Sequence, residues 1–215
     1  MSEKKLGLNE AYSLKTPKDS VKLYKKWAQT YDTDFALNSN YQSPKIISNF
    51  YNKYANKNDT PILDVGAGTG LVGEYFLKFG QKNIIAIDIS QEMLRQAESK
   101  ECYSSIIQAD LTKKLPLKNN SMGAIVSAGT FTHGHVGPNS FDELLRVTKP
   151  GGLFILSINT KVFKSNGFEE KFREIKKKIS TPKFIRFNAH AKHKDKKFSK
   201  VEIFASIFRK NKIKA

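Results

Sequence analysis

The chain has 215 residues, a formal net charge of +17 and a single cysteine, Cys102. This length suits one domain with a sizeable core, and no window approaches the roughly 18 apolar residues that span a membrane. The N-terminal residues lack the apolar core of a signal peptide. One thiol excludes an internal disulfide and a multi-thiolate metal site. We therefore expect a cytoplasmic protein without a metal.

The positive charge is distributed unevenly along the chain. Residues 161–215 hold 18 Lys and Arg against 5 Asp and Glu. Such asymmetry can mark a surface for nucleic acid or an anionic membrane. However, only five of the 37 basic residues are Arg, which is preferred where phosphates or bases are held in fixed geometry. A composition rich in Lys, Asn and Ile is also typical of a low-GC genome, and we favour that interpretation.

Two helices are expected near the N-terminus, after a loose polar lead-in over residues 1–19. The first runs from Ser20, a plausible N-cap, to about Ala36, with apolar residues mostly at helical spacing. The second runs from Pro44 to Tyr54, with proline in its first turn. The first helix is rich in aromatic side chains, which can serve either for packing or as a lid over a site.

A strand, a glycine turn and a helix are predicted by residues 62–73, which read Ile-Leu-Asp-Val-Gly-Ala-Gly-Thr-Gly-Leu-Val-Gly. Glycine suits a sharp turn that a ligand approaches closely. The glycines from Gly68 to Gly73 fit the dinucleotide pattern G-x-G-x-x-G. Asp64 followed by G-x-G-x-G from Gly66 suits instead a positively charged ligand without a phosphate, such as S-adenosylmethionine. The glycine turn alone is thus compatible with either a dinucleotide or S-adenosylmethionine.

A second buried strand is predicted over residues 83–89, and it contains Asp88, 20 residues after Gly68. A carboxylate at that place in a βαβ unit accepts hydrogen bonds from ribose hydroxyls. Since NAD and S-adenosylmethionine both carry a ribose, Asp88 serves either ligand. Ser90 is the expected N-cap of the next helix.

The following segments continue to alternate strands with helices, as a parallel sheet requires. The carboxylate of Asp110, at the end of the third strand, can either face a ligand or cap a turn. The expected elements are a third strand over 104–109, a fourth over 123–128 with its exit at 129–136, a helix over 139–149 and a fifth strand ending at Ile158.

The last segment predicts an antiparallel edge for the sheet. A lysine-rich amphipathic helix is expected from Phe168 to Ile179. Two strands, over 184–190 and 201–208, are expected to flank a loop at 193–199 whose lysines are solvated. The sequence contains no internal repeat and no second domain.

Four motifs in this order resemble the class I S-adenosylmethionine-dependent methyltransferases. They are the acidic residue with its glycine turn, the segment Asp-x-Ser-x-x-Met-Leu from Asp88, the acidic loop at Asp110, and Leu145-Arg-Val-Thr-Lys-Pro-Gly-Gly152. The resemblance implies an α/β fold with a Rossmann-like seven-stranded sheet, helices on both faces and an antiparallel C-terminal edge. The expected parts of a single domain over 20–215 are a helical lid (20–57), a cofactor-binding core (58–160) and a basic helix with a strand pair (161–215).

The same resemblance implies which residues hold S-adenosylmethionine and its product S-adenosylhomocysteine. Ile89 and Met93 would supply apolar surface near the adenine, and Asp110 would face its exocyclic amine. An N-terminal aromatic helix would cover the cofactor and exclude water. The residues expected at the cofactor are Trp27, Tyr31, Gly66, Ala67, Gly68, Asp88, Ile89, Met93, Asp110, Leu111 and Ser127.

A closer resemblance links residues 20–160 to the methyltransferase-like family named for the Williams–Beuren region. Its motifs here are Trp27-Ala-x-x-Tyr31-Asp-x-Asp34, Tyr41-x-x-Pro44, Leu63-Asp-Val-Gly-x-Gly-Thr-Gly-Leu-Val-Gly73 and Gly129-Thr-Phe-Thr-x-Gly-His-Val136. The typical cysteine of the glycine turn is Ala67 in this chain, a change that should leave the turn undisturbed. The resemblance brings no substrate with it.

Acceptor-facing residues are expected after the fourth strand. Methyl transfer from a sulfonium is an in-line displacement, so the protein mainly aligns the reactants in a dry site. A base is needed only where the acceptor loses a proton. His133 and His135 are the candidates to orient or deprotonate an acceptor, together with Tyr31. Alternatively, either histidine bonds the backbone of its own loop.

The absence of several sequence motifs narrows the class of acceptor molecule. The exit of the fourth strand lacks the Asn/Asp-Pro-Pro-Tyr/Phe signature of exocyclic-nitrogen methylation, and the chain has neither a Pro-Cys nucleophile nor a cluster of metal ligands. We therefore expect a small-molecule acceptor that attacks through O, N or S. The alternatives are a methyltransferase acting on RNA or protein through the basic C-terminus, and a cofactor-binding protein without independent catalysis.

Overall fold

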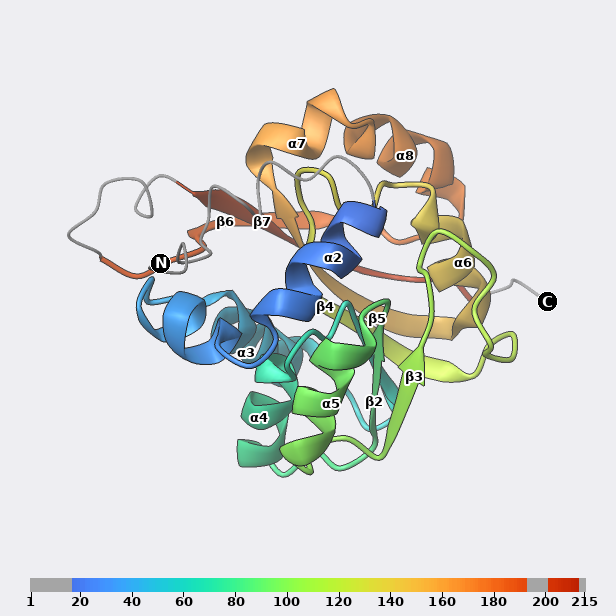
Figure 1. Cartoon of the computed structure of the whole chain (residues 1–215). Helices are drawn as coiled ribbons and strands as arrows, with labels where there is room; N and C mark the ends of the chain where they lie inside the picture. The colour runs from blue at the N-terminus through green and yellow to red at the C-terminus, as the bar shows by residue number, and fades with distance from the viewer. Residues whose placement is uncertain (1–16, 193–200, 213–215) are drawn as a thin grey trace, which may run out of the picture.

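Seven strands form one mixed sheet in the computed structural model, in the order β3-β2-β1-β4-β5-β7-β6 (Figure 1). The structure describes residues 17–192 and 201–212. The first five strands are parallel, and β7 runs antiparallel to both β5 and β6. The predicted Rossmann-like sheet with an antiparallel C-terminal edge is therefore confirmed. The strands are β1 (Ile62–Val65), β2 (Ile84–Asp88), β3 (Ser105–Gln108), β4 (Met122–Phe131), β5 (Thr148–Asn159), β6 (Lys183–Asn188) and β7 (Glu202–Arg209).

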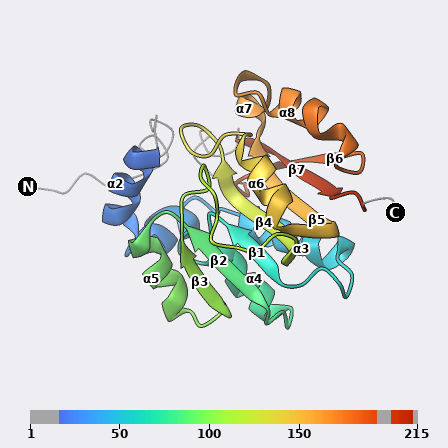
Figure 2. The ribbon, with the colours of Figure 1, turned by 90° about the vertical axis from the view of Figure 1, so that its right-hand side faces the viewer.

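Helices cover both faces of the sheet (Figure 2). One face packs against α3, α4 and α5, and the other packs against α6, α7 and α8. No helix in the described part of the chain is long and apolar enough to span a membrane. The helices are α2 (Pro17–Trp27), the π-helix η1 (Tyr31–Leu37), α3 (Ser43–Tyr54), α4 (Leu71–Lys78), α5 (Gln91–Ser99), α6 (Ser140–Val147), α7 (Thr160–Ser165), α8 (Phe168–Glu174) and the 3₁₀-helix η2 (Ile175–Lys177).

The central strand β1 shows why this sequence forms a two-faced sheet. All four of its residues are buried, as expected for a parallel strand covered on both sides. Its side chains alternate between the faces. Ile62 packs with the cluster of α3 and α4, whereas Leu63 and Val65 pack with the cluster of α6 and α8. The continuous apolar run before the glycine turn is therefore shared by two cores.

The single N-terminal helix predicted from Ser20 to Ala36 is wrong in two respects. The helix begins earlier, at Pro17, so Ser20 is not its N-cap, and it ends at Trp27. The chain then resumes as the wider π-helix η1. Packing among aromatic rings accompanies this change, since Trp27 lies 5.1 Å from Tyr31 and 5.3 Å from Phe35 between ring centroids.

The C-terminal prediction also needs correction. The helix expected from Phe168 to Ile179 ends at Glu174 and continues only as one 3₁₀ turn, and α7 was not predicted. The strand pair is confirmed as β6 and β7. The loop at 193–199 lies outside the described residues, as do residues 1–16 of the predicted lead-in.

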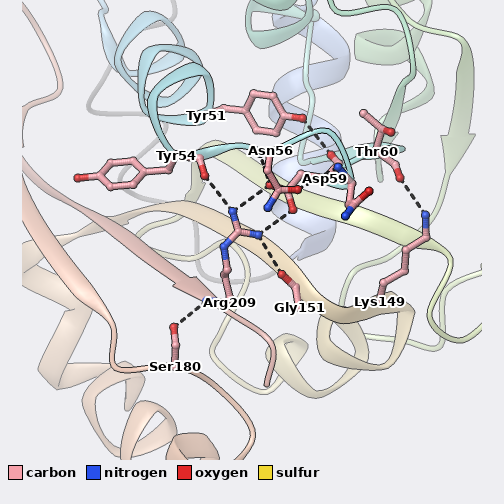
Figure 3. Close-up of polar contacts among 10 residues, drawn as sticks. Tyr51, Tyr54, Asn56, Asp59, Thr60, Lys149, Gly151, Ser180 and Arg209 are labelled. Carbon is pink, nitrogen blue, oxygen red and sulfur yellow. Dashed lines mark hydrogen bonds and ion pairs between the residues drawn. The ribbon is translucent and has the colours of Figure 1, made fainter. Parts of the chain in front are cut away.

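An ion pair joins the last strand to the turn that precedes β1 (Figure 3). Arg209 of β7 donates two hydrogen bonds to the carboxylate of Asp59, at 2.8 and 2.9 Å. It also donates to the carbonyl oxygens of Tyr54 and Gly151. The Asp59 side chain is only 2% exposed, and its Oδ2 also accepts the backbone N–H of Asn56. This pair fixes the entry to β1 against β7, which lies between β5 and the edge strand β6.

Replacing Arg209 with Met should destabilise the fold by about 3 kcal/mol, because removing one partner leaves a buried carboxylate without its counter-charge. Urea unfolding followed by circular dichroism measures this loss. The matched control is Arg173→Met, which removes an exposed (i, i+4) pair with Glu169 and should cost under about 0.5 kcal/mol. Equal losses in the two variants would contradict a structural role for the Arg209 pair.

Candidate functional site

A cavity lies at the carboxyl ends of β1, β2 and β4, beneath the N-terminal helices. It encloses about 930 Å³ of empty space, its open mouth included. Ligands of open α/β sheets bind at this edge, where neighbouring strands diverge. The cavity is lined by Tyr24, Tyr31, Tyr41, Pro44, Gly66, Ala67, Gly68, Thr69, Leu71, Val72, Asp88, Ile89, Met93, Asp110, Leu111, Ala128, Gly129, Thr130, His135 and Val136.

The glycine turn forms the floor of this cavity. Gly66 and Gly68 both have positive φ values, of 68° and 55°, which side chains other than glycine rarely adopt. A Cβ on Gly66 would lie 2.0 Å from Thr130 Oγ1, so close packing excludes one there. A Cβ on Gly68 would meet nothing within 4 Å among the described residues. The backbone at Gly68 therefore presents open space to a ligand.

Asp88 stands at the end of β2 and joins the turn to the next helix. Its Oδ2 accepts the backbone N–H of Gly68 at 2.9 Å, and its Oδ1 accepts that of Ser90 at 2.9 Å. Burial raises the pKa of Asp88, and these backbone hydrogen bonds oppose the shift. Each oxygen keeps a second lone pair for a donor in the cavity. The carboxylate can thus accept two hydroxyl groups, as a ribose requires.

The adjoining wall provides an apolar slot with a polar end. The slot is lined by Ile89, Met93 and Leu111. Ser90 is the predicted N-cap, and its Oγ accepts the backbone N–H of Met93, which holds Met93 in place. Asp110 lies at the same wall, but its Oδ1 already accepts from the backbone and hydroxyl of Thr112. Asp110 therefore caps its own turn and also lines the cavity. The two roles considered for its carboxylate, capping a turn and facing a ligand, are compatible.

Four residues are placed away from this cavity, in contrast to the expectation from the sequence. Trp27 is 1% exposed and Ser127 is fully buried, and neither lines this cavity. The Ser127 hydroxyl instead donates to the carbonyl oxygen of Val65. His133 lies outside the cavity wall. Asp64 is fully buried and accepts the Tyr103 hydroxyl at 2.7 Å, and burial raises its pKa to about 7. Its carboxylate is enclosed in the fold and is not part of the cavity wall.

His135, by contrast, lines the cavity in a defined protonation state. Its Nδ1 lies 2.6 Å from the carbonyl oxygen of His133, which can only accept, so Nδ1 carries the proton. Burial lowers the pKa of His135, so the ring is neutral near pH 7. Its Nε2 then accepts the Tyr24 hydroxyl at 2.8 Å. The arrangement leaves a basic nitrogen at the cavity wall.

Sequence reasoning missed several lining residues, notably Tyr24, Tyr41 and Thr130. Tyr24 precedes Tyr31 by seven residues, which places both on one face of a helical stretch. Tyr41 and Thr130 stand inside the motifs quoted for the Williams–Beuren-region family. Tyr41 and Thr130 could therefore be identified as members of a motif. The sequence did not show that their side chains point toward the cavity.

A polar network holds the N-terminal segment against the glycine turn. Asp32 of η1 accepts the Thr69 hydroxyl at 2.5 Å and pairs with Lys100 at 2.5 Å. Lys100 also pairs with Glu74 at 2.8 Å. Because Thr69 lies in the turn and Lys100 follows α5, the network ties the cover of the cavity to its floor. Among the described residues, no group of three His, Cys, Asp or Glu side chains could hold a metal.

Comparisons with known proteins identify the class to which this site belongs. A methyltransferase domain family matches residues 63–156. Methyltransferase-like protein 27 from Homo sapiens is 29% identical over 163 residues, which cover 74% of this chain and 66% of that protein. Demethylmenaquinone methyltransferase from Renibacterium salmoninarum is 32% identical over 96 residues, or 45% of this chain and 40% of that enzyme.

A solved structure shares the fold. A SAM-dependent methyltransferase from Aquifex aeolicus superposes with a TM-score of 0.55 at 18% identity, covering 86% of this chain and 96% of that chain. Residues 63–156 therefore match a methyltransferase domain, and the chain has the fold of the class I S-adenosylmethionine-dependent methyltransferases. Its cofactor is S-adenosylmethionine. The matched regions span two thirds or less of these curated relatives, and none of them identifies the acceptor.

The residues present fit that cofactor. The open space at Gly68 admits a close backbone approach, Asp88 offers two acceptor atoms for a ribose, and the slot at Met93 is apolar enough for a purine. The assignment of these individual residues stays a prediction.

Asp88→Asn should weaken binding of S-adenosylhomocysteine about 10- to 100-fold, because hydrogen bonds to a charged group contribute about 1.5–3 kcal/mol each. Isothermal titration calorimetry measures the affinity. Glu92→Gln is the control, since Glu92 lies nearby on α5 but outside the cavity wall. Unchanged affinity in Asp88→Asn, or wild-type binding of NAD in place of S-adenosylhomocysteine, would contradict the ribose assignment.

Asp32→Asn should accelerate dissociation of S-adenosylhomocysteine several-fold, because the amide cannot pair with the Lys100 ammonium. Stopped-flow displacement measures the rate. Asp34→Asn, on the same π-helix but outside the network, should leave the rate unchanged. Equal rates in all three proteins would show that the network does not retain the ligand.

Proposed function

We propose that this protein transfers the methyl group of S-adenosylmethionine to a small-molecule acceptor. The observation that carries the proposal is the cavity beneath the N-terminal helices, whose wall includes Tyr31 and His135 beside the glycine turn. A site roofed by helices admits a small molecule more readily than a folded polymer. The relative named for demethylmenaquinone methylation also takes a small-molecule acceptor.

Each part of the chain has a role in this proposal. Residues 20–57 form the lid, 58–160 the cofactor-binding core and 161–215 the basic helix and strand pair that complete the sheet. The cofactor supplies an electrophilic methyl group on a sulfonium. Gly66 and Gly68 let the backbone approach it, Asp88 orients its ribose, and Tyr31 helps to exclude water.

His135 acts on the acceptor. Since its Nδ1 proton is held by the carbonyl oxygen of His133, its Nε2 is the atom that can receive a proton. The Tyr24 hydroxyl already donates to Nε2, so the acceptor's proton reaches the ring along this hydrogen bond. A low pKa keeps the ring in its neutral, proton-accepting form. His133 supports the ring through its backbone.

The rate should fall at acidic pH, because His135 must be neutral to accept a proton. Burial lowers its pKa below the ordinary value of about 6.5. Activity should therefore be constant through neutral pH and decline only below that value. His135→Gln should lower kcat about 100-fold and remove this acid limb, whereas His133→Gln should keep it. An acid limb that persists in His135→Gln would assign the base elsewhere.

A screen of small phenols, thiols and amines with radiolabelled S-adenosylmethionine tests the acceptor class. Transfer to at least one of them supports the proposal. Transfer only to RNA or protein, or tight cofactor binding with no transfer to any of these acceptors, would contradict it. The first contrary result would direct attention to the basic segment 161–215, and the second to a non-catalytic role.

A further inference from the structure

A second cavity adjoins the cofactor cavity on the side of β5 and β7. We name it the aromatic chamber, and it encloses about 550 Å³ of empty space, its mouth included. Tyr24, Tyr31, Tyr41, Gly129 and His135 line both cavities, so a molecule in the chamber faces the cofactor site across these shared residues. The chamber's other lining residues are Trp27, Ser43, Phe35, Phe131, Thr132, Ser157, Asn159, Ala189, His190, Val201 and Ile203.

Ring faces and edges make most of the chamber wall. Phe35 lies at the centre of this ring cluster, with centroids 5.3 Å from Trp27, 5.1 Å from Tyr31 and 5.5 Å from Tyr41. Tyr41 in turn lies 5.4 Å from the ring of His190. Rings at such separations offer both stacking and edge-to-face contacts. The wall therefore suits a flat aromatic molecule.

Three polar atoms of the wall have no hydrogen-bond partner among the described residues. They are Trp27 Nε1, Ser43 Oγ and Thr132 Oγ1, and all are buried. Leaving such a group unpaired costs about 1–3 kcal/mol. Since buried polar groups in native proteins are nearly always paired, three in one chamber indicate a ligand with oxygen atoms. The indole N–H can only donate, so it matches an oxygen lone pair rather than an ammonium group.

The described residues of this wall include no Lys, Arg, Asp or Glu. The chain has 37 Lys and Arg and 20 Asp and Glu, yet none of them is among the described residues that line the chamber. A charged molecule would be buried there without a counter-ion, at high cost. An aromatic box on its own also suits an ammonium group, but the N–H donor of Trp27 opposes that choice.

We propose that the aromatic chamber is the acceptor site and that its acceptor is an uncharged phenol. This inference rests on the proposed function, because the chamber is paired with the cofactor cavity. The rings hold the acceptor's aromatic part, and Trp27, Ser43 and Thr132 hydrogen-bond its oxygen substituents. The phenol O–H proton would pass to the Tyr24 hydroxyl while Tyr24 gives its own proton to His135 Nε2. The phenol oxygen would gain the methyl group, and S-adenosylhomocysteine would leave as a neutral thioether.

Trp27 makes the proposal testable by binding alone, because it is the only tryptophan of the chain and it lines the chamber. The probes are 3,5-dihydroxybenzyl alcohol as the uncharged phenol, 3,5-dihydroxybenzoate and 3,5-dihydroxybenzylammonium, which have similar size, carry further oxygen substituents and differ in charge. Each is titrated into the full chain, with and without saturating S-adenosylhomocysteine, and followed by Trp27 fluorescence and calorimetry. The phenol should bind at least tenfold more tightly than either ion and change the fluorescence saturably.

Two variants remove the unpaired hydroxyl groups. Thr132→Val and Ser43→Ala should each weaken phenol binding about 5- to 10-fold while the melting temperature stays equal or rises, because neither hydroxyl has a partner among the described residues. Ser48→Ala is the matched control on α3. Its hydroxyl is also buried but donates to the Pro44 carbonyl oxygen, so this variant should lower stability and leave phenol binding unchanged.

The outcomes separate this inference from the proposed function. Equal or tighter binding of an ion, no binding of the phenol, or phenol binding that both hydroxyl variants leave unchanged would each overturn the chamber proposal. If S-adenosylhomocysteine still binds in those cases, the methyltransferase proposal stands. If the phenol binds as expected but S-adenosylhomocysteine does not, the chamber stands as a phenol site and the proposed function falls.

Discussion

The site depends on one carboxylate that joins three successive elements. Asp88 ends β2, holds the glycine turn after β1 through Gly68 N–H, and holds the start of α5 through Ser90 N–H. Both bonds are made by backbone groups, so the turn keeps its shape whatever side chains surround it. The geometry that lets a ligand approach Gly68 is therefore built from the same atoms that would bind its ribose. Preorganisation of this kind lowers the cost of ordering the site on binding.

The N-terminal segment covers the site that lies at the carboxyl ends of the strands. Its rings cover the cofactor cavity and form the aromatic chamber, while Asp32 fastens the segment to Thr69 and Lys100. Two neighbouring cavities with different chemistry result. One has a carboxylate and open backbone for a nucleoside, and the other has rings and neutral donors. His135 lies on the wall that they share, where its Nε2 can serve a reaction between their occupants.

Much of the fold was predictable, because parallel strands need apolar runs and glycine turns need glycine. The positions of the parallel strands, the N-cap Ser90 and the cavity position of Asp88 follow from such local requirements, whereas the seven-stranded sheet was implied by the resemblance to the methyltransferases. Side-chain direction was harder to predict. Trp27 stands in the expected segment but lines the aromatic chamber, Ser127 is buried in the fold, and Asp64 is buried against Tyr103. The aromatic chamber arises from ring contacts between segments far apart in sequence, such as those of Phe35 and Tyr41 with His190, which periodicity alone does not predict.

A crystal structure of the chain with S-adenosylhomocysteine tests the central claim most directly. The account predicts that both ribose hydroxyls lie within hydrogen-bond distance of the Asp88 carboxylate, with the adenine against Ile89 and Leu111 and the sulfur facing the wall shared with the aromatic chamber. Binding in another cavity, or a ribose that makes no contact with Asp88, would contradict the account.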